Sequence, residues 1–151
     1  MQLQMTFIRI LILFCLFICT SNLFGQITYG EKRVAFDQEK KVLIYLGNNI
    51  PYLRFTPTVA DIDSADSFLQ KYFLTIFTKQ NNHPKLENYY RQYVGVIQNG
   101  LKCIYINASY KKENYFLENT FYPKGGGEGY FQTVVNINDK KIINFHFNAP
   151  K

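Results

Sequence analysis

Residues 90–108 read YRQYVGVIQNGLKCIYINA, and this stretch decides the fold. On both sides of Asn99-Gly100 its β-branched and aromatic residues recur with a period of two, which is typical of β-strands. Asn-Gly tolerates the positive φ angles of a tight turn, so the stretch predicts an antiparallel hairpin. Toward the C-terminus the same period returns in residues 130–137 and 141–147, which predicts a second hairpin across residues 138–140.

Two features lie between these hairpins. Residues 115–122 are rich in aromatics and are expected to form a further strand. The glycine run 125–129 (GGGEG) is expected to be a connection or bulge between strands. A phosphate-binding loop would require Gly-x4-Gly-Lys-[Ser/Thr] before a helix, whereas Lys124 precedes this run and no helix follows.

On the N-terminal side of the first hairpin the period changes to three and four residues. Thr58 can cap a helix with its hydroxyl, and the Asp61 carboxylate favours the positive helix end. The apolar positions behind them predict an amphipathic helix over residues 59–77. Still earlier, residues 34–36 and 42–45 flank a polar turn and are expected to form another hairpin.

This order of elements predicts an α+β domain. N-terminal strands are followed by one long amphipathic helix, packed on a curled antiparallel sheet of about four consecutive C-terminal strands. The element order resembles cystatin-like and NTF2-like proteins. The chain has 12 Tyr and 14 Phe, which supply a core without a disulfide or metal.

The first 25 residues are typical of an export signal. Arg9 precedes an apolar run over residues 10–18, and a small residue stands at Gly25. We expect residues 1–25 to be a signal peptide cleaved between Gly25 and Gln26, with residues 26–151 forming a single exported domain, periplasmic or extracellular. After cleavage we expect no stable membrane span.

Two alternatives remain for this segment. An uncleaved anchor is one, although the apolar run is shorter than the roughly 20 residues that span a bilayer. Lipidation at Cys15 or Cys19 is the other, although bulky Phe14 and Ile18 precede these cysteines.

Charge and cysteine content exclude several classes of function. The chain has 17 basic and 11 acidic residues, but the basic ones are scattered pairs, so we expect no nucleic-acid partner. Cys103 is the single cysteine after residue 25 and is expected to be a small buried residue in a strand. Neither His-x3-His nor Cys-x2-Cys spacing occurs, and we predict neither a metal site nor a cofactor.

Aromatic residues crowd the C-terminal half of the sequence. Strands use them for packing, but the face of Tyr93 opposes that of Tyr90, and both cannot face the helix. We therefore expect some of these rings to be exposed and to contact a ligand. The candidate ligand-binding residues are Tyr93, Tyr105, Tyr130, Phe131, Gly125, Gly126 and Gly127.

The leading hypothesis is an exported, non-enzymatic module that binds a protein, peptide or glycan. One alternative is a small periplasmic hydrolase or isomerase with an NTF2-like pocket, which would bring together at least two of His83, Glu87, Asp61 and His146. Another is a structural subunit of the cell envelope. Asn107-Ala-Ser109 also matches the glycosylation sequon, which requires a surface position.

Three motifs carry one resemblance: residues 57–62 (PTVADI), residues 91–95 (RQYVG) with the Asn-Gly turn, and the glycines of 125–127 with Tyr130-Phe131. Together they resemble short uncharacterised secreted proteins of Bacteroidota-type bacteria, to which Phe24-Gly-Gln26 is also similar. The resemblance covers most of residues 26–151 and implies export and this fold, but no activity. The glycine run departs from the pattern, which would have fewer glycines.

Overall fold

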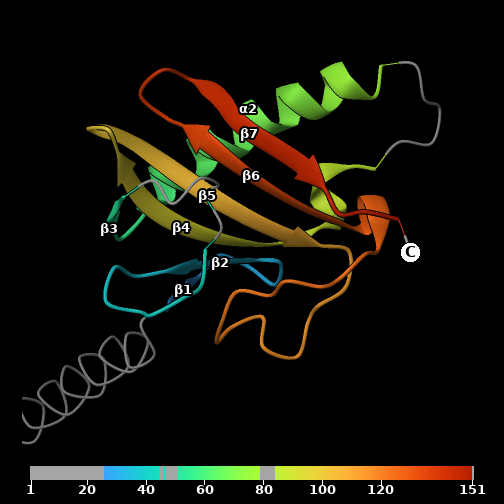
Figure 1. Cartoon of the computed structure of the whole chain (residues 1–151), viewed down its shortest axis with the longest axis horizontal. Coiled ribbons are helices and arrows are strands. Elements are labelled where there is room, and N and C mark those ends of the chain that lie inside the picture. Colours follow the sequence, from blue (N-terminus) through green and yellow to red (C-terminus); the bar gives the residue numbers. More distant parts are fainter. Residues whose placement is uncertain (1–25, 45, 47–50, 79–83, 151) are drawn as a thin grey trace, which may run out of the picture.

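The computed structural model describes residues 26–44, 46, 51–78 and 84–150. The predicted signal peptide, residues 1–25, lies outside them, as do Tyr45 and His83. One helix packs against a curled, mostly antiparallel sheet of seven strands, which confirms the α+β class (Figure 1). The strands are β1 (Gln26–Thr28), β2 (Arg33–Phe36), β3 (Leu53–Phe55), β4 (Tyr90–Gln98), β5 (Leu101–Ser109), β6 (Tyr130–Asn136) and β7 (Lys141–Phe147).

The helix, α2 (Val59–Ile76), occupies the predicted residues. Thr58 Oγ1 accepts a hydrogen bond from the Asp61 N–H at 3.2 Å, and the Asp61 carboxylate accepts one from the Thr58 N–H at 2.9 Å. This reciprocal capping box satisfies two backbone donors at the helix start. The buried residues Ile62, Ala65, Leu69 and Phe73 recur every three or four positions and face the sheet.

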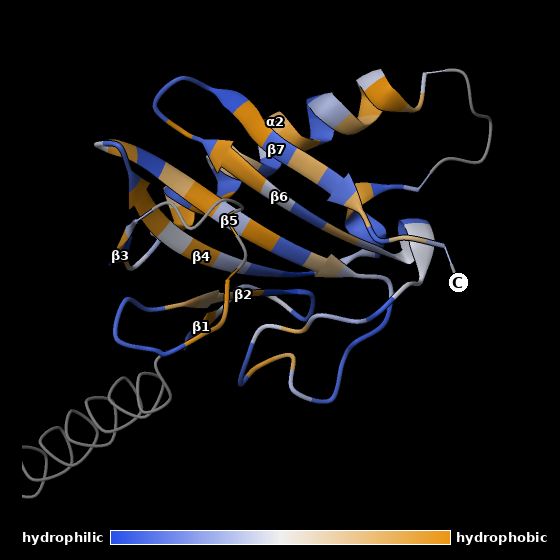
Figure 2. Cartoon of the chain, in the orientation of Figure 1, coloured by the Kyte–Doolittle hydropathy of each residue, from blue (hydrophilic) through white to orange (hydrophobic). Residues whose placement is uncertain are grey.

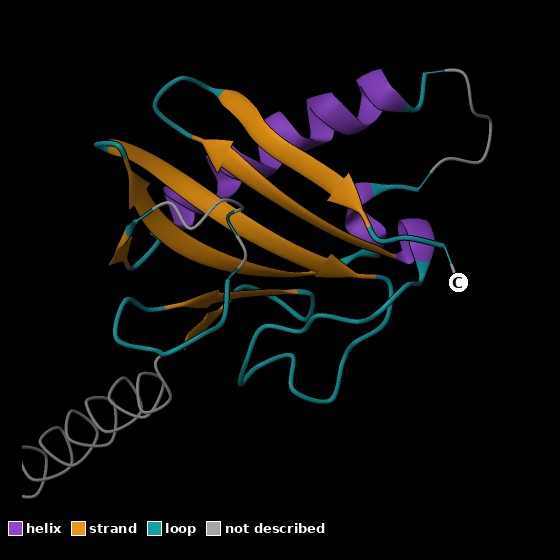
Figure 3. Ribbon diagram, viewed as in Figure 1, coloured by secondary structure: helices purple, strands orange, loops and turns teal. Residues whose placement is uncertain are grey.

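Both predicted hairpins are confirmed. β4 pairs antiparallel with β5 across Asn99 and Gly100, whose φ angles are 51° and 75°, and β6 pairs antiparallel with β7. The strand order is β1-β2-β4-β5-β6-β7, with β3 also pairing with β4 (Figure 3). Along β4 the residues are hydrophilic at the start of the strand and mostly hydrophobic toward the turn with β5 (Figure 2).

The N-terminal hairpin prediction was wrong. β2 pairs antiparallel with β1 and parallel with β4, and residues 42–44 form no strand. The parallel pairing places Phe36 beside Val94 on one sheet face, so the N-terminal strands extend the same sheet instead of forming a separate hairpin. Short-range pattern cannot reveal this, because the two strands are separated by the helix.

The strand predicted over residues 115–122 was also wrong. Phe116 N–H donates to the Glu113 carbonyl, and the Glu118 and Asn119 N–H groups both donate to the Tyr115 carbonyl, which makes tight turns. Other carbonyls of this segment accept bonds from buried side-chain amides. Its backbone groups are therefore satisfied without a strand partner.

The sheet has a hydrophobic core on each face. One core lies beneath α2 and includes Tyr93, Ile104 and Phe131. The other includes Val94 and Tyr105. It is covered by Val42, Ile44 and Leu46 and by Phe116 and Phe121 from the β5–β6 loop. Chain segments thus cover both faces of β4, and the aromatic rings expected to be exposed are found outside the strands, at Tyr110 and Tyr115. Two short 3₁₀ turns, η2 (Leu86–Asn88) and η3 (Gly127–Gly129), flank the strands.

Among the residues placed in space, no helix combines the length and the apolar character that a membrane crossing requires.

Gly95 illustrates how closely β3 approaches β4. A Cβ at this position would overlap the Phe55 carbonyl oxygen and lie 3.0 Å from its ring. We expect Gly95→Ala to destabilise the domain by about 1–3 kcal/mol, because β3 must move away from β4. Urea unfolding measures the loss. Gly129→Ala is the control, since its Cβ would meet only Tyr110 at 3.9 Å, and equal stability of the two variants would contradict the prediction.

Candidate functional site

A cavity of about 330 Å³ lies where β5 leaves the sheet and β6 enters it. We call it the glycine-loop cavity. Its lining is drawn from the start and the end of the β5–β6 connection, with Tyr130 from the first position of β6. The lining residues are Tyr110, Lys111, Pro123, Lys124, Gly125, Gly126, Gly129 and Tyr130.

The glycine loop has a defined conformation. Gly125, Gly126 and Gly127 have φ angles of 76°, 96° and 54°, in the left-handed region that favours glycine. The Gly127 N–H donates to the Ala149 carbonyl at 3.1 Å. Asn148 Nδ2 donates to the carbonyls of Pro123 at 2.8 Å and Gly125 at 3.1 Å. The run predicted as a connection between strands is thus a connection tied to the residues after β7.

Tyr130 forms one wall of the cavity. Its ring lies directly over Gly126, where a Cβ would be 2.5 Å from Tyr130 Cδ2. Its hydroxyl donates to Glu113 Oε1 at 2.8 Å, and this hydrogen bond, followed by burial, raises the pKa of Tyr130. A glycine at position 126 is therefore required for the ring to lie where it does.

Tyr110 forms a second wall and is 40% exposed. Its ring packs on Tyr89 with a centroid distance of 4.3 Å, and its N–H donates to the Gly129 carbonyl at 2.9 Å. The Tyr89 hydroxyl in turn donates to the Glu128 carbonyl at 2.6 Å, and burial raises the pKa of Tyr89 well above its ordinary value. Both aromatic walls are thus attached to the glycine loop.

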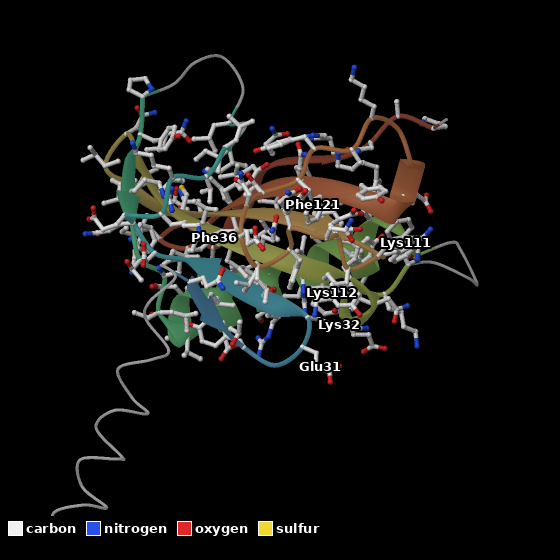
Figure 4. The ribbon with its side chains drawn as sticks, turned by 90° about the horizontal axis from the view of Figure 1, so that it is seen from below. Glu31, Lys32, Phe36, Lys111, Lys112 and Phe121 are labelled. Atoms are coloured by element: carbon white, nitrogen blue, oxygen red, sulfur yellow. The ribbon has the colours of Figure 1, made fainter. Side chains whose placement is uncertain are left out.

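The charged residues of the lining are both cations, while the nearby Glu113 carboxylate is engaged by the Tyr130 hydroxyl. These cations are Lys111 and Lys124, and no carboxylate belongs to the lining. Lys111 lies at the same end of the molecule as Lys112 and Lys32 (Figure 4). Within the described part of the chain, the N–H groups of Gly125 and Gly126 donate no hydrogen bond. Ammonium groups beside backbone donors can hold an anion.

The structure brings together only part of the predicted ligand-binding set. Tyr130, Gly125 and Gly126 line the cavity, and Gly127 continues the same loop. Tyr93, Tyr105 and Phe131 are at most 1% exposed and serve as core residues. The candidate ligand-binding residues that remain are therefore Gly125, Gly126, Gly127 and Tyr130.

Sequence reasoning missed Tyr110, Lys111 and Lys124 as neighbours of the glycine loop. Lys124 directly precedes the glycines, which was a usable signal. Tyr110 and Lys111 reach the loop only because β5 and β6 are antiparallel neighbours, and no local pattern shows that.

Of the residues considered for catalysis, the three that the structure describes lie on different elements: Asp61 in α2, Glu87 in η2 and His146 in β7. Burial tends to raise the pKa of Asp61, but hydrogen bonds from Lys102, at 2.8 Å, and from Thr58 outweigh it and lower that pKa. His146 Nε2 lies 2.9 Å from Oε1 of Gln132, its pairing partner on β6. Both side chains are on the sheet face away from α2. Glu87 has a largely exposed side chain in η2, and His83 lies outside the described residues.

Burial argues against a reactive thiol at Cys103 and against glycosylation at Asn107. The Cys103 thiol is buried, and burial raises its pKa, which disfavours the reactive thiolate. Asn107 of the sequon is 1% exposed, and its amide donates to the Phe121 carbonyl at 2.7 Å, so it is inaccessible in the folded domain. Among residues 26–44, 46, 51–78 and 84–150, no cluster of His, Cys, Asp and Glu could hold a metal ion.

Comparison with known proteins found no matching family model, and neither a curated protein nor a solved structure is significantly similar to this chain.

Proposed function

We propose that this chain is an exported binding module without enzymatic activity, and that its glycine-loop cavity holds a carboxylate-bearing group of a peptide or glycan ligand. The observation that carries the proposal is the lining itself. Two tyrosine walls and a tied glycine loop are combined with Lys111 and Lys124, and these lysines are the charged residues of the lining.

The size of the cavity supports a small ligand group. About 330 Å³ is at the lower end of the range for small-molecule sites, which is about 300–1,000 Å³. It is large enough for one sugar or one amino-acid residue, with the ring of Tyr110 offering apolar contact. Because the loop is held by hydrogen bonds to Asn148 and Ala149, little ordering is needed when a ligand binds.

The lining also supports binding over catalysis. It contains no Ser, Cys, His, Asp or Glu, the residue types that most often act as nucleophile or general base. Export of the module rests on the signal pattern of residues 1–25, which ends at Gly25.

Titration with glucuronate and with N-acetylglutamate tests the proposed site. We expect at least one of them to bind, and Lys124→Gln to weaken that binding about tenfold, as expected for loss of a charge-assisted hydrogen bond that is partly screened by solvent. Higher salt should weaken binding by the wild type as well. Isothermal titration calorimetry measures both effects.

Lys141→Gln is the matched control for this titration. Lys141 is a lysine of similar exposure at the opposite end of β6–β7, and its loss should leave the affinity unchanged. If neither acid binds, or if Lys124→Gln binds as tightly as the wild type, the proposed site is wrong.

A further inference from the structure

A second and larger hollow lies on the sheet face away from α2. It is an open groove of about 1010 Å³ between the β5–β6 loop and the turn that follows β2. Figure 1 shows these two segments on the same side of the sheet. We call it the loop–turn groove, and its lining residues are Gln26, Lys40, Lys41, Glu113, Asn114, Tyr115, Leu117, Glu118, Asn119, Thr120 and Phe121.

The charged side chains that line this groove balance one another. Lys40 and Lys41 come from the turn, and Glu113 and Glu118 come from the loop, so the lining has two positive and two negative groups. This balance contrasts with the glycine-loop cavity and does not favour an ionic ligand of either sign. A neutral ligand is the better electrostatic match.

The loop that forms one wall is held by buried amides. Gln92 is fully buried, and its Nε2 donates to the carbonyls of Phe116 at 2.8 Å and Asn119 at 2.7 Å. Asn107, its partner across β4 and β5, donates to the Phe121 carbonyl. A buried amide is costly without such partners, so the same bonds that satisfy these side chains also fix the loop.

Tyr115 is the exposed ring that this fixed loop presents. It is 67% exposed, whereas the next residue, Phe116, is 1% exposed and packs against Tyr90 at a centroid distance of 5.6 Å. The Tyr115 carbonyl accepts the N–H groups of Glu118 and Asn119, so the ring stands on a tight turn. A rigid, flat aromatic face beside polar side chains can stack on the apolar face of a sugar ring.

The polar lining supplies donors and acceptors together. Asn114 and Asn119 provide amides that can do both. Sugar hydroxyls also donate and accept. We infer that the loop–turn groove binds a neutral oligosaccharide, which stacks on Tyr115 and is held by the amides, carboxylates and ammonium groups around it.

An extended peptide fits these observations less well. Peptides that add to a sheet need a long exposed strand edge, whereas β1, the strand that contributes Gln26, has only three residues. The most exposed apolar residue of the lining is Tyr115, at 67%. The two linings share no residue, although the Tyr130 hydroxyl of the glycine-loop cavity donates to Glu113 of the groove.

Calorimetric titration with cellohexaose, laminarihexaose and chitohexaose tests this inference. We expect one of these neutral oligosaccharides to bind to the wild type, and Tyr115→Ala to weaken the binding about tenfold or more. Tyr52→Ala is the matched control, because Tyr52 is 39% exposed and lies outside the groove. Lys124→Gln should leave this binding unchanged, which separates it from the carboxylate site.

A second variant tests the role of the fixed loop. Gln92→Leu should weaken oligosaccharide binding while the chain stays folded, as judged by circular dichroism; if it unfolds, Tyr115→Ala still decides the result. Failure of all three sugars to bind at millimolar concentration would overturn the inference, as would equal binding by Tyr115→Ala and the wild type. Binding of an uncharged extended peptide, (Thr-Val)₃, that is lost in Tyr115→Ala and accompanied by no sugar binding, would also overturn it in favour of a peptide site.

Discussion

Replacing Phe73 by alanine is expected to destabilise the domain by about 3–5 kcal/mol, the usual cost of truncating a buried aromatic side chain. Phe73 is 1% exposed and lies at the centre of the core beneath α2. Its ring centroid is 5.3 Å from that of Phe131, 5.8 Å from that of Phe145 and 5.9 Å from that of Tyr89. The variant would leave a cavity where the helix, β6, β7 and the residue before β4 meet.

The measurement is equilibrium unfolding in urea, with Leu74→Ala as the control. Leu74 is the next residue on the same helix and is 53% exposed, so its loss should cost less than about 1 kcal/mol. A loss at Phe73 no larger than at Leu74 would show that the packing of α2 on the sheet is not as described.

Replacing Asp66 by alanine has the second large effect, also about 3–5 kcal/mol, because it leaves a buried positive charge without its partner. The Asp66 carboxylate lies 3.3 Å from Arg91 Nη1 and accepts a hydrogen bond from the Tyr93 hydroxyl at 2.8 Å. Arg91 is 9% exposed, and its Nε already has no hydrogen-bond partner in the described residues. Burial raises the pKa of Asp66 in spite of the two arginines beside it.

Asp63→Ala provides the matched control. Asp63 is on the same helix and pairs with Arg33 at 2.9 Å, but its side chain is 58% exposed, so its loss should cost less than about 1 kcal/mol. The double variant Asp66→Leu with Arg91→Met removes both buried charges and should recover much of the stability lost in Asp66→Ala. If the double variant is no more stable than Asp66→Ala, then packing, and not the unpaired charge, accounts for the loss.

The local sequence pattern was sufficient to predict the elements whose hydrogen bonds form within a short stretch of chain. The Thr58–Asp61 capping box and the apolar spacing behind it predict α2, because a helix bonds only to itself. Asn99-Gly100 predicts the β4–β5 hairpin, because that pair favours the positive φ angles of the turn. Burial of Cys103 likewise followed from its place in a strand.

The candidate site could be predicted only where its residues are adjacent in the sequence. Gly125, Gly126 and Tyr130 were identified from the glycine run, whereas Tyr110 and Lys111 were not, since they join it through the pairing of Ser109 with Tyr130. Tyr93 and Tyr105 were candidate ligand-binding residues but are buried, because the segments that cover their strands come from distant parts of the chain.

By itself, then, the sequence determined the helix, the two tight hairpins and the α+β class, all of which depend on residues within a few positions of one another. The tertiary structure alone decided the parallel pairing of β2 with β4 and the non-strand form of residues 115–122. In both cases the deciding partners are far away in the chain. Val94 pairs with Phe36, which precedes the helix in the chain. The Gln92 side chain donates to carbonyls of the loop that follows β5. Buried backbone N–H and C=O groups need hydrogen-bond partners, and in these segments the partners come from residues far away in the sequence.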